Sequence, residues 1–312
     1  MKPTIALVAR TVTRSPELLS LAQSRFAAAH IKVAPREADF LDGQELAHFL
    51  RPASGAIIGR EVISAAVLQQ CPNLKAIAMY GVGTDNIDFL ACQKNGVQVL
   101  ESPGVNADAA AEFTLGLMIS LCRNICLTNA AMRQGQWQKN GGTQLSGKTV
   151  AIIGVGAIGQ RVARHLDLMG CHLLLVDLRD VTDFAHQLTH AQQISLEQAL
   201  ATADIVSLHM PLNSTTRGYL SAERLAIMAP QSWLINAARG ELVDLSAAKK
   251  RLQSNELAGL GVDVYPNEPH FDQELVQLPQ VVATPHIAGN AREAVHAAGS
   301  AAISKLAEFL QL

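Results

Sequence analysis

Three closely spaced glycines in the middle of the chain have the neighbours that phosphate binding requires. They belong to the turn GVGAIG, in which Gly154, Gly156 and Gly159 follow the apolar run 150–153 and precede a segment with helical spacing. The first glycine permits a tight turn, the second lets backbone N–H groups approach a pyrophosphate, and the third lets a helix pack closely on a strand. The helix N-terminus then presents unpaired N–H groups to the phosphates.

An acidic residue stands where such a site needs one. The apolar run 172–176 ends in Asp177, eighteen residues after Gly159, where a carboxylate can accept hydrogen bonds from an adenosine ribose diol. The order of strand, turn, helix, strand and acid favours dinucleotide binding over a merely tight turn. Asp177 would repel a 2′-phosphate and therefore favours NAD, whereas Arg179, two residues later, leaves a phosphorylated ribose open as the alternative.

Polar residues also follow several predicted strands in the second half of the chain. Open α/β sheets bind ligands outside the carboxyl ends of their strands, so these residues are candidates for chemistry. Each of them alone also has a structural interpretation, but their recurrence favours function. The residues are His209, Asn236, Arg239, Asp263, Glu268 and His286.

The elements that must position these residues alternate between strand and helix patterns, which predicts parallel sheets. Short apolar runs form a first series at 4–9, 31–34, 55–58, 75–79 and 97–100. A second series lies at 150–153, 172–176, 205–208, 232–235, 260–264 and 281–283. The second series predicts a six-stranded Rossmann-type sheet.

A break between the two series predicts two domains. The stretch 101–104 ends the first series, and a long apolar helix is expected over about 106–132, with few charges over 109–126. A helical pattern over 290–312 follows the last strand and is expected to return to the first sheet. We therefore predict an α/β protein in which a Rossmann-type NAD-binding domain, 102–287, is inserted into a smaller flavodoxin-like substrate domain, 1–101 and 288–312.

Composition excludes several classes of protein. The 312 residues carry a formal net charge of −2 without runs of like charge, so neither nucleic acid nor a membrane is an expected partner. The N-terminal apolar run is too short for a signal peptide. Five scattered cysteines without a CxxC pair fit a reducing compartment, and we expect a cytoplasmic protein. Cys122 and Cys126 are interpreted as small buried residues rather than as a metal or redox pair, and no metal is expected.

Seven motifs between residues 56 and 289 make the chain resemble the D-isomer-specific 2-hydroxyacid dehydrogenases, most closely their phosphoglycerate dehydrogenase-like branch. The motifs are YGVGTDNID from Tyr80, PGVNADAAAEFTLGLM from Pro103, GVGAIG from Gly154, HMPLNSTTRGYL from His209, INAARGELVD from Ile235, GVDVYPNEP from Gly261 and TPHIAG from Thr284. The resemblance implies NAD-dependent interconversion of a D-2-hydroxy acid and a 2-keto acid, in which 3-phosphoglycerate is one candidate substrate.

The resemblance also implies roles for individual residues. His286 would give a proton to the developing alkoxide, Glu268 would orient its ring and favour its charged form, and Arg239 would clamp the substrate carboxylate. The substrate anion would also meet the backbone N–H groups of Val82 and Gly83. Arg60, in IIGREVIS, is interpreted either as a cationic partner for a substrate phosphate or as a solvated residue at the start of a helix. The cofactor contacts would be Gly154, Gly156, Ala157, Ile158, Gly159, Asp177, His209, Met210, Pro211, Ala237 and Asp263. A homodimer formed through 109–126 is expected.

Two departures from the family pattern and two alternatives complete the prediction. Met79 stands where related sequences often have a basic residue, which removes one partner for a phosphate. No regulatory domain is expected after Leu312, and hence no feedback by serine. The first alternative is a glyoxylate or hydroxypyruvate reductase that prefers NADPH, which Asp177 disfavours. The second is an NAD(H)-sensing, corepressor-like scaffold, although such proteins usually carry long tails.

Overall fold

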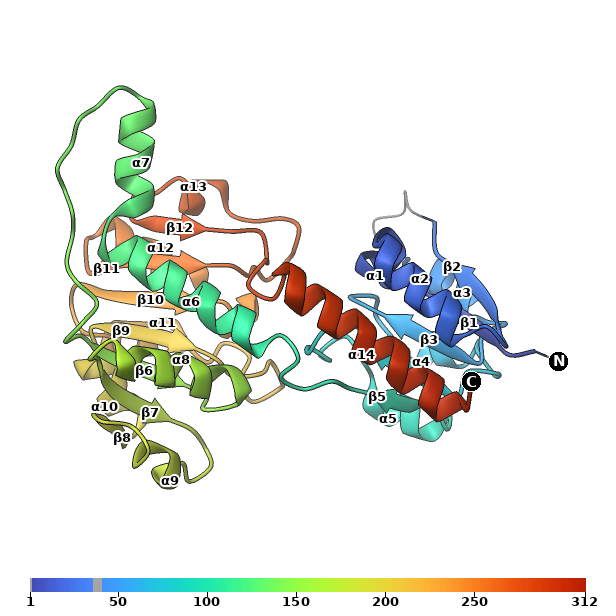
Figure 1. The fold of residues 1–312 in the computed structure, drawn as a ribbon. Helices are drawn as coiled ribbons and strands as arrows, with labels where there is room; N and C mark the ends of the chain where they lie inside the picture. Colours follow the sequence, from blue (N-terminus) through green and yellow to red (C-terminus); the bar gives the residue numbers. More distant parts are fainter. Residues whose placement is uncertain (1, 36–40) are drawn as a thin grey trace. The chain divides into compact units, whose positions relative to one another are not determined.

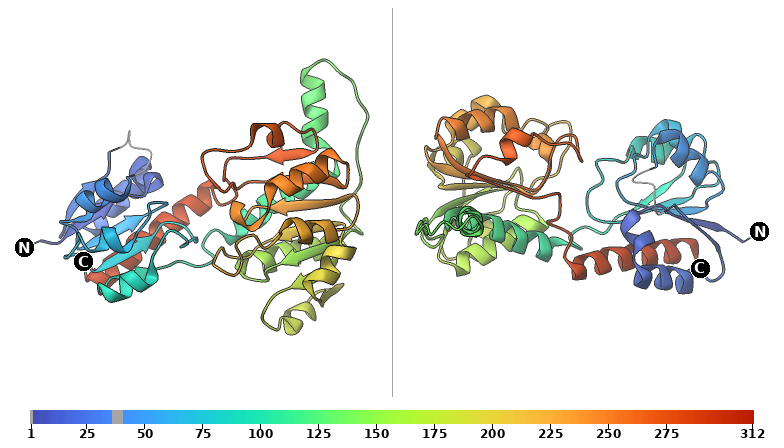
Figure 2. Two further views of the ribbon diagram at one scale, coloured as in Figure 1. Left: turned by 180° about the vertical axis from the view of Figure 1, so that it is seen from behind. Right: turned by 90° about the horizontal axis from the view of Figure 1, so that it is seen from above.

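The computed structural model describes residues 2–35 and 41–312, which form two compact units. Unit 1 comprises Met1–Asn106 and Asn290–Leu312, and unit 2 comprises Ala107–Gly289. Both divisions fall in turns or loops, a few residues further along the chain than the expected divisions after residues 101 and 287. Each unit is an α/β structure built on one parallel sheet (Figures 1 and 2).

Unit 1 holds five parallel strands in the order β2-β1-β3-β4-β5, which is the flavodoxin-like order. The strands are β1 (Thr4–Leu7), β2 (His30–Val33), β3 (Gly55–Ile58), β4 (Ala76–Met79) and β5 (Gln98–Leu100). The helices are α1 (Arg10–Arg14), α2 (Pro16–Arg25), α3 (Gly43–Leu50), α4 (Ala65–Leu68), α5 (Phe89–Lys94) and α14 (Arg292–Leu310). The expected flavodoxin-like fold of this part is confirmed.

The two faces of the unit 1 sheet carry separate cores because successive strand residues point to opposite sides. Ile58 packs with Leu46 of α3 on one face. Its neighbour Ile57 packs on the other face with Leu18 of α2 and Leu306 of α14. The last helix of the chain thus completes the core of the first sheet.

Unit 2 holds seven parallel strands in the order β12-β11-β10-β9-β6-β7-β8, the Rossmann order with one further strand at the β12 edge. The strands are β6 (Thr149–Ile153), β7 (His172–Val176), β8 (Ala191–Gln193), β9 (Ile205–Leu208), β10 (Ser232–Asn236), β11 (Leu257–Val262) and β12 (Val281–Ala283). The helices are α6 (Ala107–Cys122), α7 (Ile125–Arg133), α8 (Ala157–Leu168), α9 (Thr182–Ala185), α10 (Leu196–Thr202), α11 (Ala222–Ile227), η1 (Gly240–Leu242), α12 (Leu245–Gln253) and α13 (Gln273–Val276).

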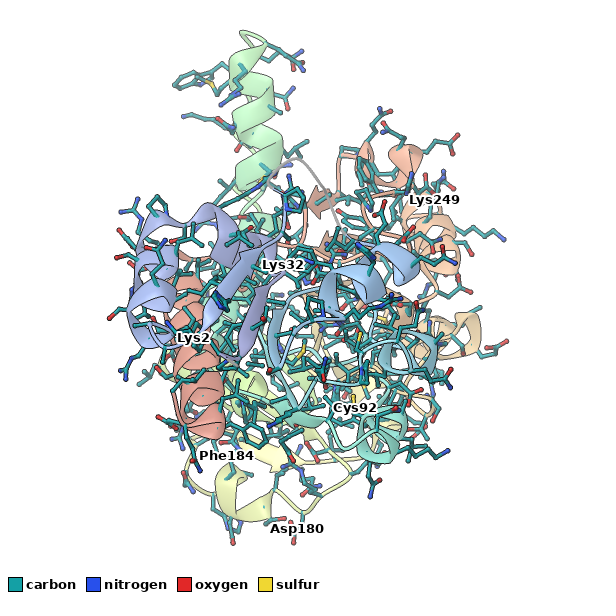
Figure 3. All side chains as sticks on the ribbon, turned by 90° about the vertical axis from the view of Figure 1, so that its right-hand side faces the viewer. Lys2, Lys32, Cys92, Asp180, Phe184 and Lys249 are labelled. Atoms are coloured by element: carbon teal, nitrogen blue, oxygen red, sulfur yellow. The ribbon has the colours of Figure 1, made fainter. Side chains whose placement is uncertain are left out.

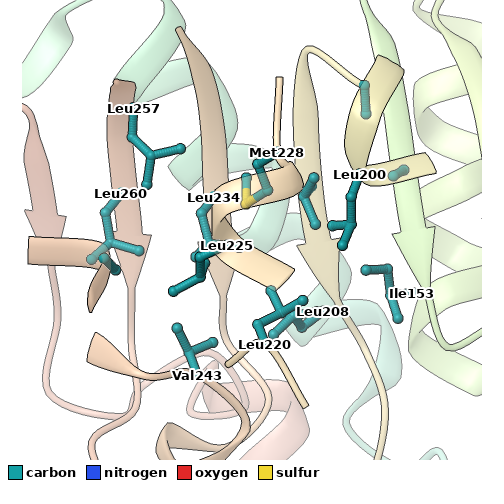
Figure 4. Close-up of a cluster of buried hydrophobic side chains, with 14 of the residues drawn as sticks. Ile153, Leu200, Leu208, Leu220, Leu225, Met228, Leu234, Val243, Leu257 and Leu260 are labelled. Atoms are coloured by element: carbon teal, nitrogen blue, oxygen red, sulfur yellow. The ribbon is translucent and has the colours of Figure 1, made fainter. Parts of the chain in front are cut away.

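The unit 2 sheet is buried on both faces, as its apolar strand sequences predict. Figure 4 shows one of the two cores, in which Ile153, Leu208, Leu234 and Leu260 come from neighbouring strands and are at most 1% exposed. Helices cover these side chains, with Leu225 of α11 among the contacts. The sheet is therefore a rigid base for the residues at its carboxyl edge.

Two sequence predictions about unit 2 were wrong. The sixth predicted strand is in fact the seventh, because β8 is a short edge strand of sequence AQQ that has no apolar run to reveal it. The single helix expected over 106–132 is broken at Asn124, whose backbone is left-handed with φ of 51°. Asparagine tolerates this conformation better than most residues. Cys122 and Cys126 consequently lie on different helices, and Cys126 is exposed rather than buried.

No single helix in the described part of the chain is long and apolar enough to cross a membrane. The bent pair formed by α6 and α7, at 64° to each other, satisfies the criterion by length and composition alone.

The C-terminal helix gives a test of the unit 1 core. Leu306 is fully buried, so replacing it with alanine should lower the free energy of unfolding by roughly 2–5 kcal/mol. The exposed Glu308, two residues away, supplies the control, and Glu308→Ala should change stability by less than about 0.5 kcal/mol. Urea denaturation followed by circular dichroism measures both. Equal midpoints for the two variants would contradict the packing of α14 against the sheet.

Candidate active site

The glycine turn connects β6 to α8 and brings backbone very close to backbone. A Cβ added to Gly154, whose φ is +94°, would lie 2.8 Å from the backbone of His209 and Met210. A Cβ at Gly159 would lie 2.0 Å from the carbonyl oxygen of Gly154. Gly156 differs, since nothing lies within 4 Å of its added Cβ. Packing within the protein therefore requires glycine at positions 154 and 159, whereas the space beside Gly156 is open to a ligand.

The start of α8 offers backbone donors beside that open space. Gly156 is the N-cap, and no side chain caps this helix. Ala157 is exposed and Ile158 is half-buried at the first turn. The N–H groups of this turn can therefore meet an anion.

Asp177 lies directly after β7, and its carboxylate is already bonded to the protein. Oδ2 accepts a hydrogen bond from the backbone N–H of Val155 in the glycine turn at 2.8 Å. Arg179 donates to both oxygens through its side chain. The side-chain hydrogen bonds from Arg179 lower the pKa of Asp177 most, and burial opposes them. The backbone hydrogen bonds from Arg179 and Val155 and the charge of Arg179 add to the decrease, so the pKa is about 2 and the group is ionised at neutral pH.

His286 and Glu268 form a close pair at the carboxyl edge of the same sheet. Nδ1 of His286 lies 3.0 and 2.8 Å from the two carboxylate oxygens of Glu268. Oε1 of Glu268 also accepts from the backbone N–H of Tyr265 at 3.0 Å. The glutamate side chain is 11% exposed and the imidazole is 35% exposed, so the carboxylate is held inside while the ring can reach a ligand.

A buried carboxylate positions the segment that carries His286. Asp263 is fully buried and follows β11. Its oxygens accept from the backbone N–H groups of Ile287 at 2.9 Å and Ala288 at 2.8 Å, and from Oγ1 of Thr284. Its own carbonyl accepts from the N–H of His286, whose φ is 56°. Asp263, expected to contact the cofactor, thus has a clear bonding role inside the protein.

Arg239 is held at the end of β10 by its own neighbours. The side-chain amide of Asn236 donates to the carbonyl of Arg239 at 2.9 Å. The following residue, Gly240, has no room for a side chain, because an added Cβ would lie 2.2 Å from the carbonyl carbon of Tyr265. The arginine segment is thus packed against the segment that leads to Glu268. The adjacent strands β10, β11 and β12 place Arg239, Glu268 and His286 at one edge.

The other predicted cofactor residues lie at the same edge of the sheet. His209 and Met210 follow β9, with the exposed Pro211 after them, and Ala237 follows β10. Nε2 of His209 lies 2.9 Å from Oγ of Ser207, and burial lowers the pKa of this histidine to about 4. His209 is therefore neutral at pH 7 and is not a proton donor of the kind expected of His286.

The predicted substrate residues Arg60, Val82 and Gly83 belong to unit 1, where they follow β3 and β4. Two residues that the sequence interpretation passed over organise these segments. The side-chain amide of Asn86 donates to the carbonyls of Gly59 and Glu61 and so ties the two segments together. Glu61 itself is only 3% exposed and accepts from the N–H of Gly59 at 2.8 Å. The sequence signal that could have pointed to Glu61 is a charged residue placed shortly after a buried strand.

Comparison with known proteins identifies the family. Residues 115–288 match the model of the D-isomer specific 2-hydroxyacid dehydrogenase, NAD binding domain. The chain belongs to this family. Unit 2 is therefore the NAD-binding domain of a D-isomer specific 2-hydroxyacid dehydrogenase family member, and its cofactor is NAD. The predicted family and fold class are confirmed.

Individual relatives carry different names within this dehydrogenase family. The chain is 37% identical over 284 residues to D-3-phosphoglycerate dehydrogenase of Mycobacterium leprae, covering 90% of this chain and 53% of the relative. It is 35% identical over 241 residues to glyoxylate reductase of Thermococcus litoralis, covering 74% and 72%. The crystal structure of the TT0316 protein from Thermus thermophilus has a TM-score of 0.88 at 31% identity, covering 99% and 97%. The chain spans about half the length of the mycobacterial relative.

The glycine turn allows a prediction that separates packing from ligand binding. Gly156→Ala should leave the unfolding midpoint unchanged, because its added Cβ meets nothing, but should weaken NADH binding about tenfold or more by standing between the backbone and the pyrophosphate. Gly159→Ala should instead destabilise the protein by about 1–3 kcal/mol, because its Cβ overlaps a backbone carbonyl. Fluorescence titration with NADH and urea denaturation measure the two effects. An unstable Gly156→Ala variant would contradict the division of roles.

Proposed function

We propose that the protein interconverts a D-2-hydroxy acid and a 2-keto acid with NAD as the hydride carrier. The observation that carries this proposal is the His286–Glu268 pair at 2.8 Å at the edge of an NAD-binding domain. His286 follows β12 and Glu268 follows β11, which is the neighbour of β10, the strand that Arg239 follows. The cofactor fits the residues of this edge, since the space beside Gly156 is open and the end of β7 carries an acid.

Each residue of the edge has a distinct part in the proposed reaction. When bound, NADH would supply the hydride for reduction of the keto acid, and NAD⁺ would accept it in the reverse direction. Because Nδ1 of His286 is held by Glu268, Nε2 is the atom that would exchange a proton with the substrate oxygen. The carboxylate of Glu268 would accept from Nδ1 and so hold the ring in the orientation that presents Nε2 to the substrate. The planar guanidinium of Arg239 is suited to a bidentate contact with the substrate carboxylate.

We assign the choice of substrate to unit 1. The proposed contacts there are the N–H groups of Val82 and Gly83 and the side chain of Arg60, which is exposed. Arg60 would give a phosphorylated substrate a cationic partner, so 3-phosphohydroxypyruvate is the first candidate. The name of the mycobacterial relative supports it. Glyoxylate and hydroxypyruvate are the second candidates, because Met79 provides no second cation for a phosphate. The name of the Thermococcus litoralis relative supports glyoxylate.

Turnover with a panel of 2-keto acids tests the function. NADH oxidation at 340 nm is followed with 3-phosphohydroxypyruvate, hydroxypyruvate, glyoxylate and pyruvate, and NADH binding is measured separately by fluorescence. Turnover of any of them supports the dehydrogenase, and the highest kcat/KM identifies the substrate class. NADH binding without turnover of any 2-keto acid would instead support an NAD(H)-sensing scaffold.

His286 gives the sharpest test of the mechanism. His286→Ala should lower kcat in both directions by about 10²- to 10⁴-fold while NADH binding stays within threefold of wild type. His165→Ala, at an exposed position of α8, is the control and should retain full activity. A fully active His286→Ala variant would refute the assignment.

We also propose that the protein works as a homodimer formed through unit 2, in the cytoplasm. Leu117 and Met118 of α6 are buried within unit 2, so that helix uses much of its apolar surface internally. Exposed apolar side chains lie instead beyond its end, at Ile125, Met132 and Trp137, the last 78% exposed. Such side chains are typical of a surface that a second subunit covers. All five cysteines are free, which supports a reducing compartment.

The dimer is tested by mass. Light scattering of the wild type should give twice the mass of one chain at all micromolar concentrations. Met132→Glu should shift the protein toward the monomer, because it places a charge on the proposed interface. Leu168→Glu, which changes an 86% exposed leucine of α8, should not. A wild type that stays monomeric at high concentration would exclude the dimer.

A further inference from the structure

The carboxylate expected to bind the adenosine ribose has little acceptor capacity left. A carboxylate offers about four acceptor positions, two on each oxygen. Oδ1 of Asp177 accepts from the backbone N–H and Nε of Arg179, at 2.9 and 3.0 Å. Oδ2 accepts from the N–H of Val155 and from Nη2 of Arg179, at 2.8 and 3.0 Å. A ribose diol can therefore bond fully to Asp177 only after the guanidinium of Arg179 has moved.

The backbone around this pair is fixed, so the mobile part is the arginine side chain. The side-chain amide of Gln193, on β8, donates to the carbonyl of Arg179 at 2.8 Å, and its oxygen accepts from the N–H of Val181 at 2.8 Å. The side chain of Arg179 is 66% exposed, whereas that of Asp177 is 10% exposed. Release of the guanidinium gives up its bonds to Asp177 and a bond from Nη2 to the carbonyl of Val155 at 3.1 Å, and water can replace these bonds because the side chain is so exposed.

The released guanidinium is complementary to the 2′-phosphate, the group that distinguishes NADP(H) from NAD(H). A 2′-phosphate on the ribose would be repelled by a bare Asp177 but attracted by a neighbouring arginine, which binds phosphate through two parallel N–H donors. The carboxylate of the next acid, Asp180, accepts from the N–H of Thr182 at the start of α9, at 2.9 Å. Figure 3 shows the side chain of Asp180 at the surface of this part of the unit.

We propose that Arg179 determines the dinucleotide specificity of this domain and lets it accept NADP(H) as well as NAD(H). In the free protein the guanidinium covers Asp177. With NAD(H) it gives way to the ribose diol, and with NADP(H) it pairs with the 2′-phosphate and offsets the charge of Asp177. This inference rests on the NAD-binding role of unit 2 and adds a second cofactor to it.

Binding measurements on the whole protein test the proposal without turnover. Dissociation constants for NADH and NADPH are measured by fluorescence titration for the wild type, Arg179→Ala and Arg217→Ala. Arg217 is the matched control, because it lies in the same unit, is 61% exposed and also pairs with a carboxylate, that of Glu241. Competition by adenosine 2′,5′-bisphosphate against adenosine 5′-monophosphate reports on the ribose site alone.

The wild type should bind NADPH within tenfold of NADH. Arg179→Ala should raise the ratio of the NADPH to the NADH dissociation constant at least tenfold, because it weakens the binding of NADPH and strengthens that of NADH. The ratio of the inhibition constants of adenosine 2′,5′-bisphosphate and adenosine 5′-monophosphate should rise likewise. Arg217→Ala should change neither ratio by more than threefold. A wild type that binds NADPH more than tenfold more weakly than NADH, a smaller change in Arg179→Ala, or an equal change in the control would overturn the proposal. Absence of NADH binding to the wild type would instead count against the NAD-binding role itself.

Discussion

The buried carboxylate of Asp263 is the interaction on which the geometry of the candidate active site depends. A fully buried charge is tolerated only where hydrogen bonds replace water, and here the N–H groups of Ile287 and Ala288 and the hydroxyl of Thr284 do so. The same bonds bend the chain after β12 into a tight turn around His286, which has a left-handed backbone. Loss of the carboxylate would leave several buried donors without partners, so this turn and the position of the imidazole are specified together.

Close contact between backbones provides the second constraint. Gly240 touches the backbone of Tyr265, and the N–H of Tyr265 bonds to Glu268, so the arginine and glutamate segments are built as one packed unit. Gly159 similarly lies against the carbonyl of Gly154 and sets where α8 begins. These contacts leave no room for a methyl group, and a site made in this way needs no ligand to hold its shape. Preorganisation of this kind favours binding and catalysis because little is left to order when the ligand arrives.

The proposed separation of cofactor binding in unit 2 from substrate selection in unit 1 would explain why family membership does not name the substrate. The residues proposed for cofactor binding and proton transfer all lie in unit 2, within the range that defines the family. The segments proposed to select the substrate lie in unit 1, after β3 and β4, where Asn86 and the buried Glu61 hold the loops together. Relatives named for phosphoglycerate and for glyoxylate match the chain at similar identity. On this proposal a few loop side chains select the substrate, and so few residues change the overall sequence identity very little.

The sequence by itself determined the alternation of strands and helices, the glycine turn, the family and the likeness to two known sheet orders. Buried parallel strands have continuous apolar sequences, and the turn needs glycines at fixed spacing, so both can be recognised without a structure. It did not reveal β8, whose three residues are not an apolar run, or the break at Asn124, where the apolar pattern continues through a change of backbone direction. Only the tertiary structure decided which groups bond to Asp177, Asp263 and Glu268. Their partners, such as Val155, Ile287 and His286, stand 22, 24 and 18 positions away in the chain, and no local pattern records a contact made across neighbouring strands.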